Sequence, residues 1–272
     1  MLFRSYFNKS TNPYKYEADK SRPAYASMFF VDSSFRMTWQ VNAKHKINHE
    51  FHYQNGCSCW LGIGNGQQAS PEAVLDFNYG PQILNQTTWN YPATNKLLFQ
   101  AGATFLRQEV NFVNDVSQNA SKFTGIGKPT LPKDNQYSIY ELSTGYNYGG
   151  LGLYRAVWGN NDKSNNYNQK FTVQYITGSH AFKTGVQMIR GVYDIFGFQN
   201  GPMENYFFLN GSPLLIMQWA GPFASYGRLH GEGVFAQDQW TIKRLTINAG
   251  VRFDQFFAKS LAKDNPAGKY IA

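Results

Sequence analysis

The stretch LTINAGVRFD, residues 245–254, decides the fold class. Its odd positions carry Leu, Ile, Ala, Val and Phe, and its even positions carry Thr, Asn, Gly, Arg and Asp. Successive side chains of a β-strand point to opposite faces, so this alternation predicts a strand with one apolar and one polar face. The stretch is as long as a tilted strand that crosses a membrane, whereas an ordinary strand has about five or six residues.

The same period of two recurs in FRMTWQV (35–41), KINHEFHY (46–53) and YELSTGYNY (140–148). We expect residues 1–7 to form the tail of a further strand. We expect strands at about 33–41, 45–54, 83–92, 96–110, 137–148, 151–159, 166–177, 182–197, 203–209, 213–220, 230–242 and 245–257. No stretch competes with them as a helix of normal length.

The links between these strands alternate in length. The short links are at 42–44, 93–95, 149–150, 178–181, 210–212 and 243–244. The longer links are at 8–32, 55–82, 111–136, 160–165, 198–202 and 221–229. Outer-membrane barrels have short periplasmic turns and longer extracellular loops. The sequence therefore predicts an all-β, antiparallel, up-and-down transmembrane β-barrel, with about twelve or thirteen strands in an open or partial barrel.

The composition agrees with this fold class. The 272 residues include 17% aromatic and only 15% charged residues, whereas a soluble domain has about 25% charged residues. The sequence contains no apolar run of the roughly 18 to 20 residues that a spanning helix needs, which excludes a helical membrane protein. The net charge of +8 is scattered along the chain. We therefore expect contact with outer-membrane lipid and lipopolysaccharide, and no nucleic-acid partner.

No catalytic motif is complete. His49, Glu50 and His52 lie together, but the metalloprotease pattern requires the second His one residue later, on a helix. The glycine cluster at 62–66 lacks the strand and helix that flank a nucleotide-binding loop. The loop carboxylates Asp115, Asp134 and Asp162 are too sparse for a calcium site. We expect no enzyme activity, no catalytic residue, no metal and no cofactor.

The two cysteines, Cys57 and Cys59, lie in a short Gly-rich stretch. Metal sites usually separate paired cysteines by two to four residues and add a second ligand pair, and neither condition holds here. A disulfide in an oxidising compartment and two free thiols are the open alternatives, and we favour the disulfide.

Residues 231–254 resemble a hairpin of TonB-dependent receptors. These receptors carry an aromatic-x-Gln-Asp-x-Trp strand, a short turn, and a Leu-Thr-x-Asn-x-Gly-x-Arg-aromatic-Asp strand. The matching positions are Gln237, Asp238, Trp240, Leu245, Thr246, Asn248, Gly250, Arg252 and Asp254. Residues 177–185 and 34–46 resemble two further hairpins of the same barrels. Within the family, the chain is most similar to the Oar-like receptors.

The resemblance implies TonB-dependent uptake across the outer membrane of a scarce ligand, such as a siderophore, a glycan or a peptide. The partner implied is the TonB energy-coupling complex, which acts through a plug. In these receptors the ligand meets the extracellular loops, where we expect the aromatic residues Trp60, Tyr79, Phe123, Trp219, Phe223 and Tyr226. A passive porin or adhesin-type barrel and a soluble all-β glycan-binding protein remain as alternatives.

Two expectations concern the polar face of this hairpin. Thr246, Asn248, Gly250, Arg252 and Asp254 suit a wet lumen, and we expect Arg252 or Asp254 to form a pair there. In the preceding strand the phase of the alternation is less clean, because an aspartate shares a face with a tryptophan. A β-bulge or a strand end at the interface explains this phase.

The ends of the sequence carry a further expectation. The first ten residues lack the apolar core of a signal peptide, and the chain ends KYIA rather than in an aromatic closing strand. We therefore expect residues 1–272 to be a partial receptor barrel, with signal peptide, plug and closing strands outside it.

Overall fold

The computed structural model describes residues 5–24, 26–61, 63, 68–113, 135–151, 162–197, 204–221, 223–264 and 267–270. This part of the chain is almost entirely strand, and its single helical element is a short 3-10 turn, η1 (Pro71–Ala73). Within it, no helix has the length and apolar character needed to cross a membrane.

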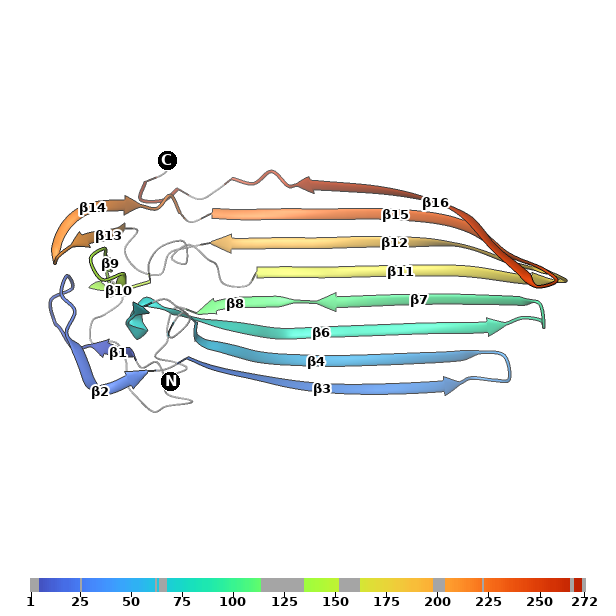
Figure 1. Ribbon diagram of the computed structural model, residues 1–272, viewed down its shortest axis with the longest axis horizontal. Helices are drawn as coiled ribbons and strands as arrows, with labels where there is room; N and C mark the ends of the chain where they lie inside the picture. Colours follow the sequence, from blue (N-terminus) through green and yellow to red (C-terminus); the bar gives the residue numbers. More distant parts are fainter. Residues whose placement is uncertain are drawn as a thin grey trace.

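A long antiparallel sheet forms the body of the molecule (Figure 1). Its strands are β3 (Ser27–Gln40), β4 (Lys46–Leu61), β6 (Leu75–Pro92), β7 (Leu97–Arg107), β8 (Glu109–Val113), β11 (Asp162–Thr177), β12 (His180–Gly197), β15 (Phe223–Ile242) and β16 (Leu245–Ser260). The order across the sheet is β16-β15-β12-β11-β7-β6-β4-β3, and β8 pairs with both β6 and β11. In the described residues β3 and β16 are the two edges, so this is an open, partial barrel wall.

Four tight turns lie at one end of this sheet, on the right in Figure 1, which we call the turn end. They join β3 to β4, β6 to β7, β11 to β12 and β15 to β16. Gly178 and Lys243 adopt positive φ angles of 57° and 54° there, as residues of tight hairpin turns do. The short links predicted at 42–44, 93–95, 178–181 and 243–244 are these four turns.

The register of the sheet separates an apolar face from a polar face. Val234 pairs with Phe253 and Trp240 pairs with Ile247, so these side chains share the apolar face. The neighbouring pairs, Gln239 with Asn248 and Gln237 with Gly250, belong to the opposite, polar face. Because the pairing between β15 and β16 continues without a shift over the whole hairpin, the alternation predicted from the sequence holds in space.

Stacked aromatic rings border the turn end of the apolar face. The His45 ring stacks on Tyr91 at 4.2 Å and on Trp89 at 5.7 Å. Farther across the sheet, the His180 ring stacks on Phe182 at 5.3 Å and on Trp240 at 5.4 Å. Aromatic side chains at such a border are typical of the interface girdles of outer-membrane barrels.

The opposite end of the sheet is covered by a folded unit that we call the cap (Figure 1). One part pairs β1 (Ser5–Asn8) with β2 (Ala18–Ala24). The other part is a five-stranded sheet in the order β14-β13-β9-β10-β5. Its strands are β5 (Gln68–Ala69), β9 (Ser138–Glu141), β10 (Tyr146–Tyr148), β13 (Glu204–Leu209) and β14 (Ser212–Gln218).

The cap differs from the sequence-based strand assignment. The strands expected at 203–209 and 213–220 form β13 and β14, which join the cap sheet and not the long sheet. Residues 137–148 form a short hairpin rather than one strand, because a turn at Leu142–Gly145 separates β9 from β10. The expected link at 8–32 contains β2 and the start of β3. The strand expected at 151–159 lies outside the described residues, apart from its first position.

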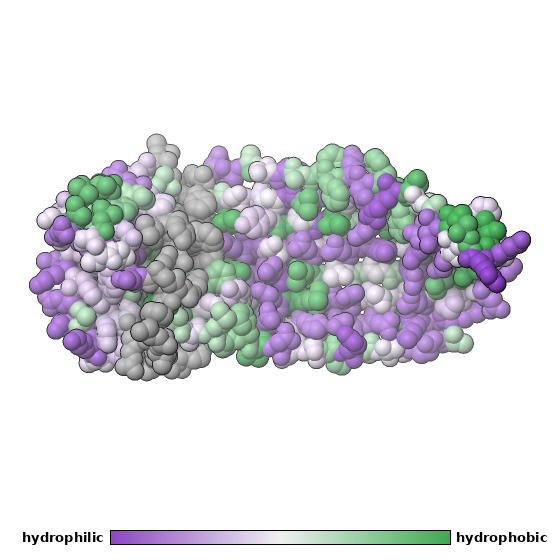
Figure 2. All heavy atoms as spheres, in the orientation of Figure 1, coloured by the Kyte–Doolittle hydropathy of each residue, from purple (hydrophilic) through white to green (hydrophobic). Residues whose placement is uncertain are grey.

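The cap has a small buried apolar cluster and an exposed apolar edge strand. Phe7 is fully buried and meets the buried Trp60 ring edge-on at 6.2 Å, within one small apolar cluster. By contrast, the edge strand β14 exposes four consecutive apolar side chains, visible as a green patch in Figure 2. They are Leu214, Leu215, Ile216 and Met217.

Candidate functional site

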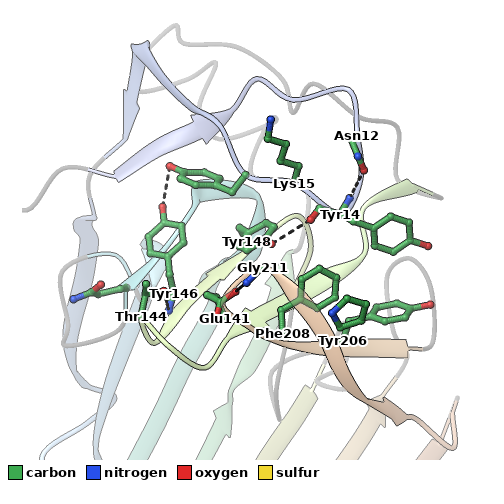
Figure 3. A pocket seen from close by; sticks show the side chains of 13 residues that line it. Asn12, Tyr14, Lys15, Glu141, Thr144, Tyr146, Tyr148, Tyr206, Phe208 and Gly211 are labelled. Carbon is green, nitrogen blue, oxygen red and sulfur yellow. Dashed lines mark hydrogen bonds between the residues drawn. The ribbon is translucent and has the colours of Figure 1, made fainter.

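The cap contains a tyrosine-rich pocket of about 1040 Å³ (Figure 3). Four cap segments form its walls: the loop between β1 and β2, the strand β5, the β9–β10 hairpin, and the β13–β14 hairpin. The lining residues are Asn12, Tyr14, Lys15, Tyr16, Gln68, Glu141, Thr144, Tyr146, Tyr148, Tyr206, Phe208, Gly211 and Pro213. Because six of these 13 residues are aromatic, the pocket is suited to a ligand with apolar flat faces.

Asparagine side chains shape the loop that carries the first tyrosines. Asn8 Oδ1 accepts hydrogen bonds from the backbone amides of Ser10 and Glu17, and Asn12 Oδ1 accepts one from the amide of Tyr14 at 2.9 Å. Such side-chain contacts replace the backbone pairing that a loop lacks. They hold Tyr14 at the pocket wall.

Tyr14 and Tyr206 form a corner of the pocket. Their rings lie 5.7 Å apart at 82° to each other. Tyr137 stacks against Tyr14 at 5.3 Å and meets Tyr206 edge-on at 5.7 Å. Offset and edge-on arrangements of this kind are the favourable geometries for aromatic pairs, so the corner is supported by its own packing.

The hydroxyl groups of the other tyrosines are engaged within the protein. Tyr146 donates to the Tyr16 hydroxyl at 3.0 Å, and Tyr16 donates to the Tyr6 carbonyl at 3.0 Å. The Tyr148 hydroxyl donates to the Tyr14 carbonyl at 3.3 Å. Burial raises the pKa of Tyr16 and Tyr146, and raises that of Tyr148 to about 12. These phenols therefore stay neutral at physiological pH.

Glu141 fastens one rim of the pocket. Its carboxylate accepts from the backbone amides of Asn210 and Gly211, both at 2.9 Å, and from the amide and hydroxyl of Ser143 at 3.1 and 2.5 Å. The hydrogen bond from the Ser143 hydroxyl is the main cause that lowers the pKa of Glu141. This carboxylate therefore ties the β13–β14 turn to the β9–β10 hairpin, with three donors on Oε1 and one on Oε2.

A buried carboxyl group lies close to the tyrosines. Glu72 in η1 is 4% exposed, and its two carboxyl oxygens make no hydrogen bond of ordinary geometry within the described residues. Burial raises the pKa of Glu72, and the nearby Ser70 hydroxyl and the Asn8 and Gly149 amides oppose that rise only in part. Because an ionised carboxylate is costly in such surroundings, the neutral acid is the favoured form.

A second group of predicted residues lies on the polar face of the long sheet. Arg252 donates two hydrogen bonds to the Asp254 carboxylate, both at 2.7 Å, and a third to Gln187 Oε1 on β12 at 3.2 Å. The pair lies across Gly233, where a Cβ would collide with it. The expected ion pair thus forms within one strand and reaches a second strand over a glycine.

An aromatic ring lies next to this pair. Phe235 packs over Gly185, and a Cβ at Gly185 would approach its Cε1 atom to 2.9 Å. The Lys170 ammonium and the Arg252 guanidinium lie 5.9 and 6.0 Å from the Phe235 ring centre. These distances permit cation–π attraction from two sides.

The remaining motif residues divide between the two faces. Gln237, Asn248 and Gly250 belong to the polar face with Arg252. Asp238 and Trp240 belong to the apolar face, where Asp238 Oδ2 lies 2.6 Å from His180 Nδ1. Of the two explanations for the phase of this strand, the β-bulge is wrong, because β15 pairs with β12 and β16 without a shift of register. The strand end at the interface fits the structure, since Asp238 lies near the turn end, where its carboxylate meets the ring of His180 that stacks on Trp240.

None of the loop aromatics that we expected to meet a ligand lines the described pocket. Trp60 is 3% exposed in the cap core, and Tyr79 lies within β6 against Phe77 at 4.4 Å. Tyr226 lies in β15 with the Lys263 ammonium 4.2 Å from its ring centre. Trp219 is half-buried just after β14. Phe123 and the side chain of Phe223 lie outside the described residues.

Cys57 and Cys59 are joined by a disulfide. Their sulfur atoms and a carboxylate oxygen of the buried Asp76 all lie within 4.8 Å of one another. Asp76 Oδ1 accepts a hydrogen bond from the Trp60 amide at 2.6 Å. Sulfurs bonded to each other are not thiolate ligands, so this group serves the cap core rather than a metal.

The pocket tyrosines were missed by the sequence reading, although the sequence marks four of them. They occur as two Tyr-x-Tyr repeats, YKY at 14–16 and YNY at 146–148. In extended chain such a repeat places both rings on one side. The repeats alone do not show that the two sides face each other, because 130 residues separate Tyr16 from Tyr146.

Residues 10–268 match a family model described as an outer membrane beta barrel domain. No curated protein matches the chain.

Proposed function

We propose that this chain, which belongs to the family of outer membrane beta barrel domains and is an outer-membrane protein, serves the active, TonB-dependent uptake of a scarce ligand. In this membrane the apolar face of the long sheet contacts lipid and the polar face lines the lumen. Short turns of such barrels face the periplasm, so the turn end is periplasmic and the cap is extracellular.

The observation that carries the proposal is the position of the aromatic pocket. It lies in the extracellular cap, at the end of a wall whose inner face carries Gln, Asn and paired charges. A pocket there is suited to capture a dilute ligand before it enters the lumen.

The proposed energy source is the TonB complex of the inner membrane, acting through a plug domain inside the barrel. This part of the proposal depends on the resemblance of residues 231–254 to a receptor hairpin. The Arg252–Asp254 pair and Phe235 project from the lumen wall and are surfaces that a plug would contact. Lipopolysaccharide is the proposed neighbour of the extracellular half of the apolar face.

The proposed role is binding and passage rather than catalysis. Among the described pocket residues the single carboxylate, Glu141, accepts four hydrogen bonds that fasten the rim. The hydrogen bond from the Ser143 hydroxyl lowers the pKa of Glu141, and a carboxylate of lowered pKa is a weak general base.

The test uses the whole protein as the cell makes it, reconstituted in liposomes. We expect no osmotic swelling in arabinose, sucrose or stachyose, and we expect the protein to retain the purified periplasmic domain of TonB in a pull-down. Swelling that slows with increasing sugar size, without TonB retention, would show a passive porin and overturn the proposal. Liposomes with a known porin and empty liposomes are the controls.

A further inference from the structure

We propose that the cap pocket binds a neutral saccharide, which names the ligand class of the uptake function and therefore rests on it. Three properties of the pocket point to this chemistry: its size, its aromatic walls, and the absence of a free cationic group among the described residues that line it.

The volume sets the scale of the ligand. At about 1040 Å³ the pocket lies at the upper end of the roughly 300–1,000 Å³ that is usual for small-molecule sites. The pocket is not enclosed and is partly open to solvent. An oligomer of several rings therefore fits better than a single small solute.

The walls present ring faces rather than free hydroxyl groups. The Tyr16, Tyr146 and Tyr148 hydroxyls are all engaged in hydrogen bonds within the cap. The corner of Tyr14 and Tyr206 leaves the Tyr14 side chain 43% exposed. Sugar rings carry an apolar face of C–H groups, and stacking such a face on an aromatic ring removes apolar surface from water.

The described lining offers no free cation. The Lys15 ammonium lies 2.9 Å from Glu17 Oε1. The single carboxylate of the lining, Glu141, accepts from the amides of Ser143, Asn210 and Gly211, which do not neutralise its charge. An anionic ligand would therefore lose hydration without gaining a cationic partner, which is costly. A neutral ligand avoids that cost.

The rim still offers hydrogen bonds. Within the described residues, the Asn12 Nδ2 group and the Gln68 side-chain amide make no hydrogen bond, and both residues are exposed at the pocket. Amide groups both donate and accept, which matches the hydroxyl groups of a sugar. Aromatic faces inside with amides at the rim form the combination that a polyhydroxylated, uncharged ring requires.

Calorimetric titration of the whole protein in a detergent without a sugar headgroup tests the proposal. The probes are neutral hexasaccharides of α-linked glucose, β-linked glucose, β-linked xylose and β-linked mannose, with hexagalacturonate as the acidic counterpart and a ferric catecholate as a non-sugar ligand. We expect at least one neutral hexasaccharide to bind and hexagalacturonate to bind at least tenfold more weakly.

Variants of the corner separate stacking from a general effect on the cap. Tyr206→Ala is expected to weaken the bound hexasaccharide about tenfold, while Tyr206→Phe, which keeps the ring, stays within about twofold of the unmodified protein. Tyr193→Ala, on the sheet outside the lining residues, is the off-site control. Near-ultraviolet circular dichroism verifies that each variant keeps the cap folded, and Tyr14→Ala replaces Tyr206→Ala if it does not.

Three results would overturn the saccharide proposal: no binding of any neutral hexasaccharide, equal affinity for hexagalacturonate, or affinity unchanged by a folded Tyr206→Ala or Tyr14→Ala variant. Binding of the ferric catecholate alone would replace it with a siderophore. These outcomes are independent of TonB retention and liposome swelling. The saccharide proposal can therefore be rejected while the proposal of TonB-dependent uptake is retained.

Discussion

Replacing Glu72 by Gln tests the electrostatics of the cap. Glu72 is 4% exposed and its pKa is raised by burial. In the unfolded chain a glutamate titrates near pH 4.3. Between that pH and the raised pKa of the folded state, the folded cap binds one proton that the unfolded cap has lost. The stability contributed by this proton is therefore complete below about pH 4.3 and is lost as pH rises through the folded pKa.

The expected dependence of cap stability on pH is that of a single bound proton. Within this window the free energy of cap unfolding falls by about 1.4 kcal/mol for each unit of pH. Gln has a similar shape and does not titrate, so Glu72→Gln abolishes this slope. The new amide adds a buried donor that lacks a partner, at a cost of about 1–3 kcal/mol that does not depend on pH. The diagnostic is therefore the slope and not the stability at one pH.

Hydrogen exchange of the whole protein from pH 5 to 8, corrected for the pH dependence of intrinsic exchange, measures this slope in peptides of η1 and β10. The matched control is Glu17→Gln, at an exposed carboxyl whose pKa is lowered by its hydrogen bond to Lys15. The stability contributed by the lowered pKa of Glu17 is present above the ordinary pKa of a glutamate and is lost only in more acidic solution. Glu17→Gln therefore leaves the slope between pH 5 and 8 unchanged. An unmodified cap without a slope, or a Glu72→Gln cap that retains it, would refute the reasoning.

Three further substitutions probe packing. Phe7→Ala removes a fully buried ring and should destabilise the cap by about 3–5 kcal/mol. We expect faster hydrogen exchange in the cap and unchanged protection of β15 and β16. An equal loss of protection in the cap and in these two strands would contradict a separate cap core. The Cys57→Ser, Cys59→Ser double variant opens a loop with a sequence separation of only 2, so loop entropy accounts for about 1.5 kcal/mol; a much larger loss in denaturant titration would contradict this small role. Gly185→Ala places a methyl group 2.5 Å from the Phe171 carbonyl oxygen and 2.9 Å from Phe235 Cε1, and should cost about 1–3 kcal/mol in unfolding free energy. An unchanged unfolding midpoint would show that the Phe171 backbone and the Phe235 ring both shift without cost.

The long sheet was predictable because its determinants are local. In β16 the alternation of residues 245–254 fixes both the strand and its two faces, and the tight turn at Lys243–Arg244 fixes its partner. The other three hairpins of this wall also close within two to five residues. The pairing of a strand whose partner follows so closely can be predicted without knowledge of the rest of the chain.

The cap was not predictable in the same way. Trp60 lies in a short Gly-rich stretch that resembles a loop, yet its positive φ of 52° and its contact with Phe7 place it in a core. The contact joins residues 53 positions apart, and the tyrosine pocket joins segments still farther apart. Periodicity within one segment carries no information on such partners, so the candidate loop aromatics and the real pocket residues differ.

The cap has a consequence for assembly in the membrane. Its pocket needs residues 12–16, 141–148 and 206–213, and between these segments the chain crosses the sheet several times. Contacts that close such long loops form late, after the strands between them have been placed. A chain that stalls during insertion would display no complete pocket at the cell surface. Ligand binding at the cell surface would then report that assembly of the barrel is complete.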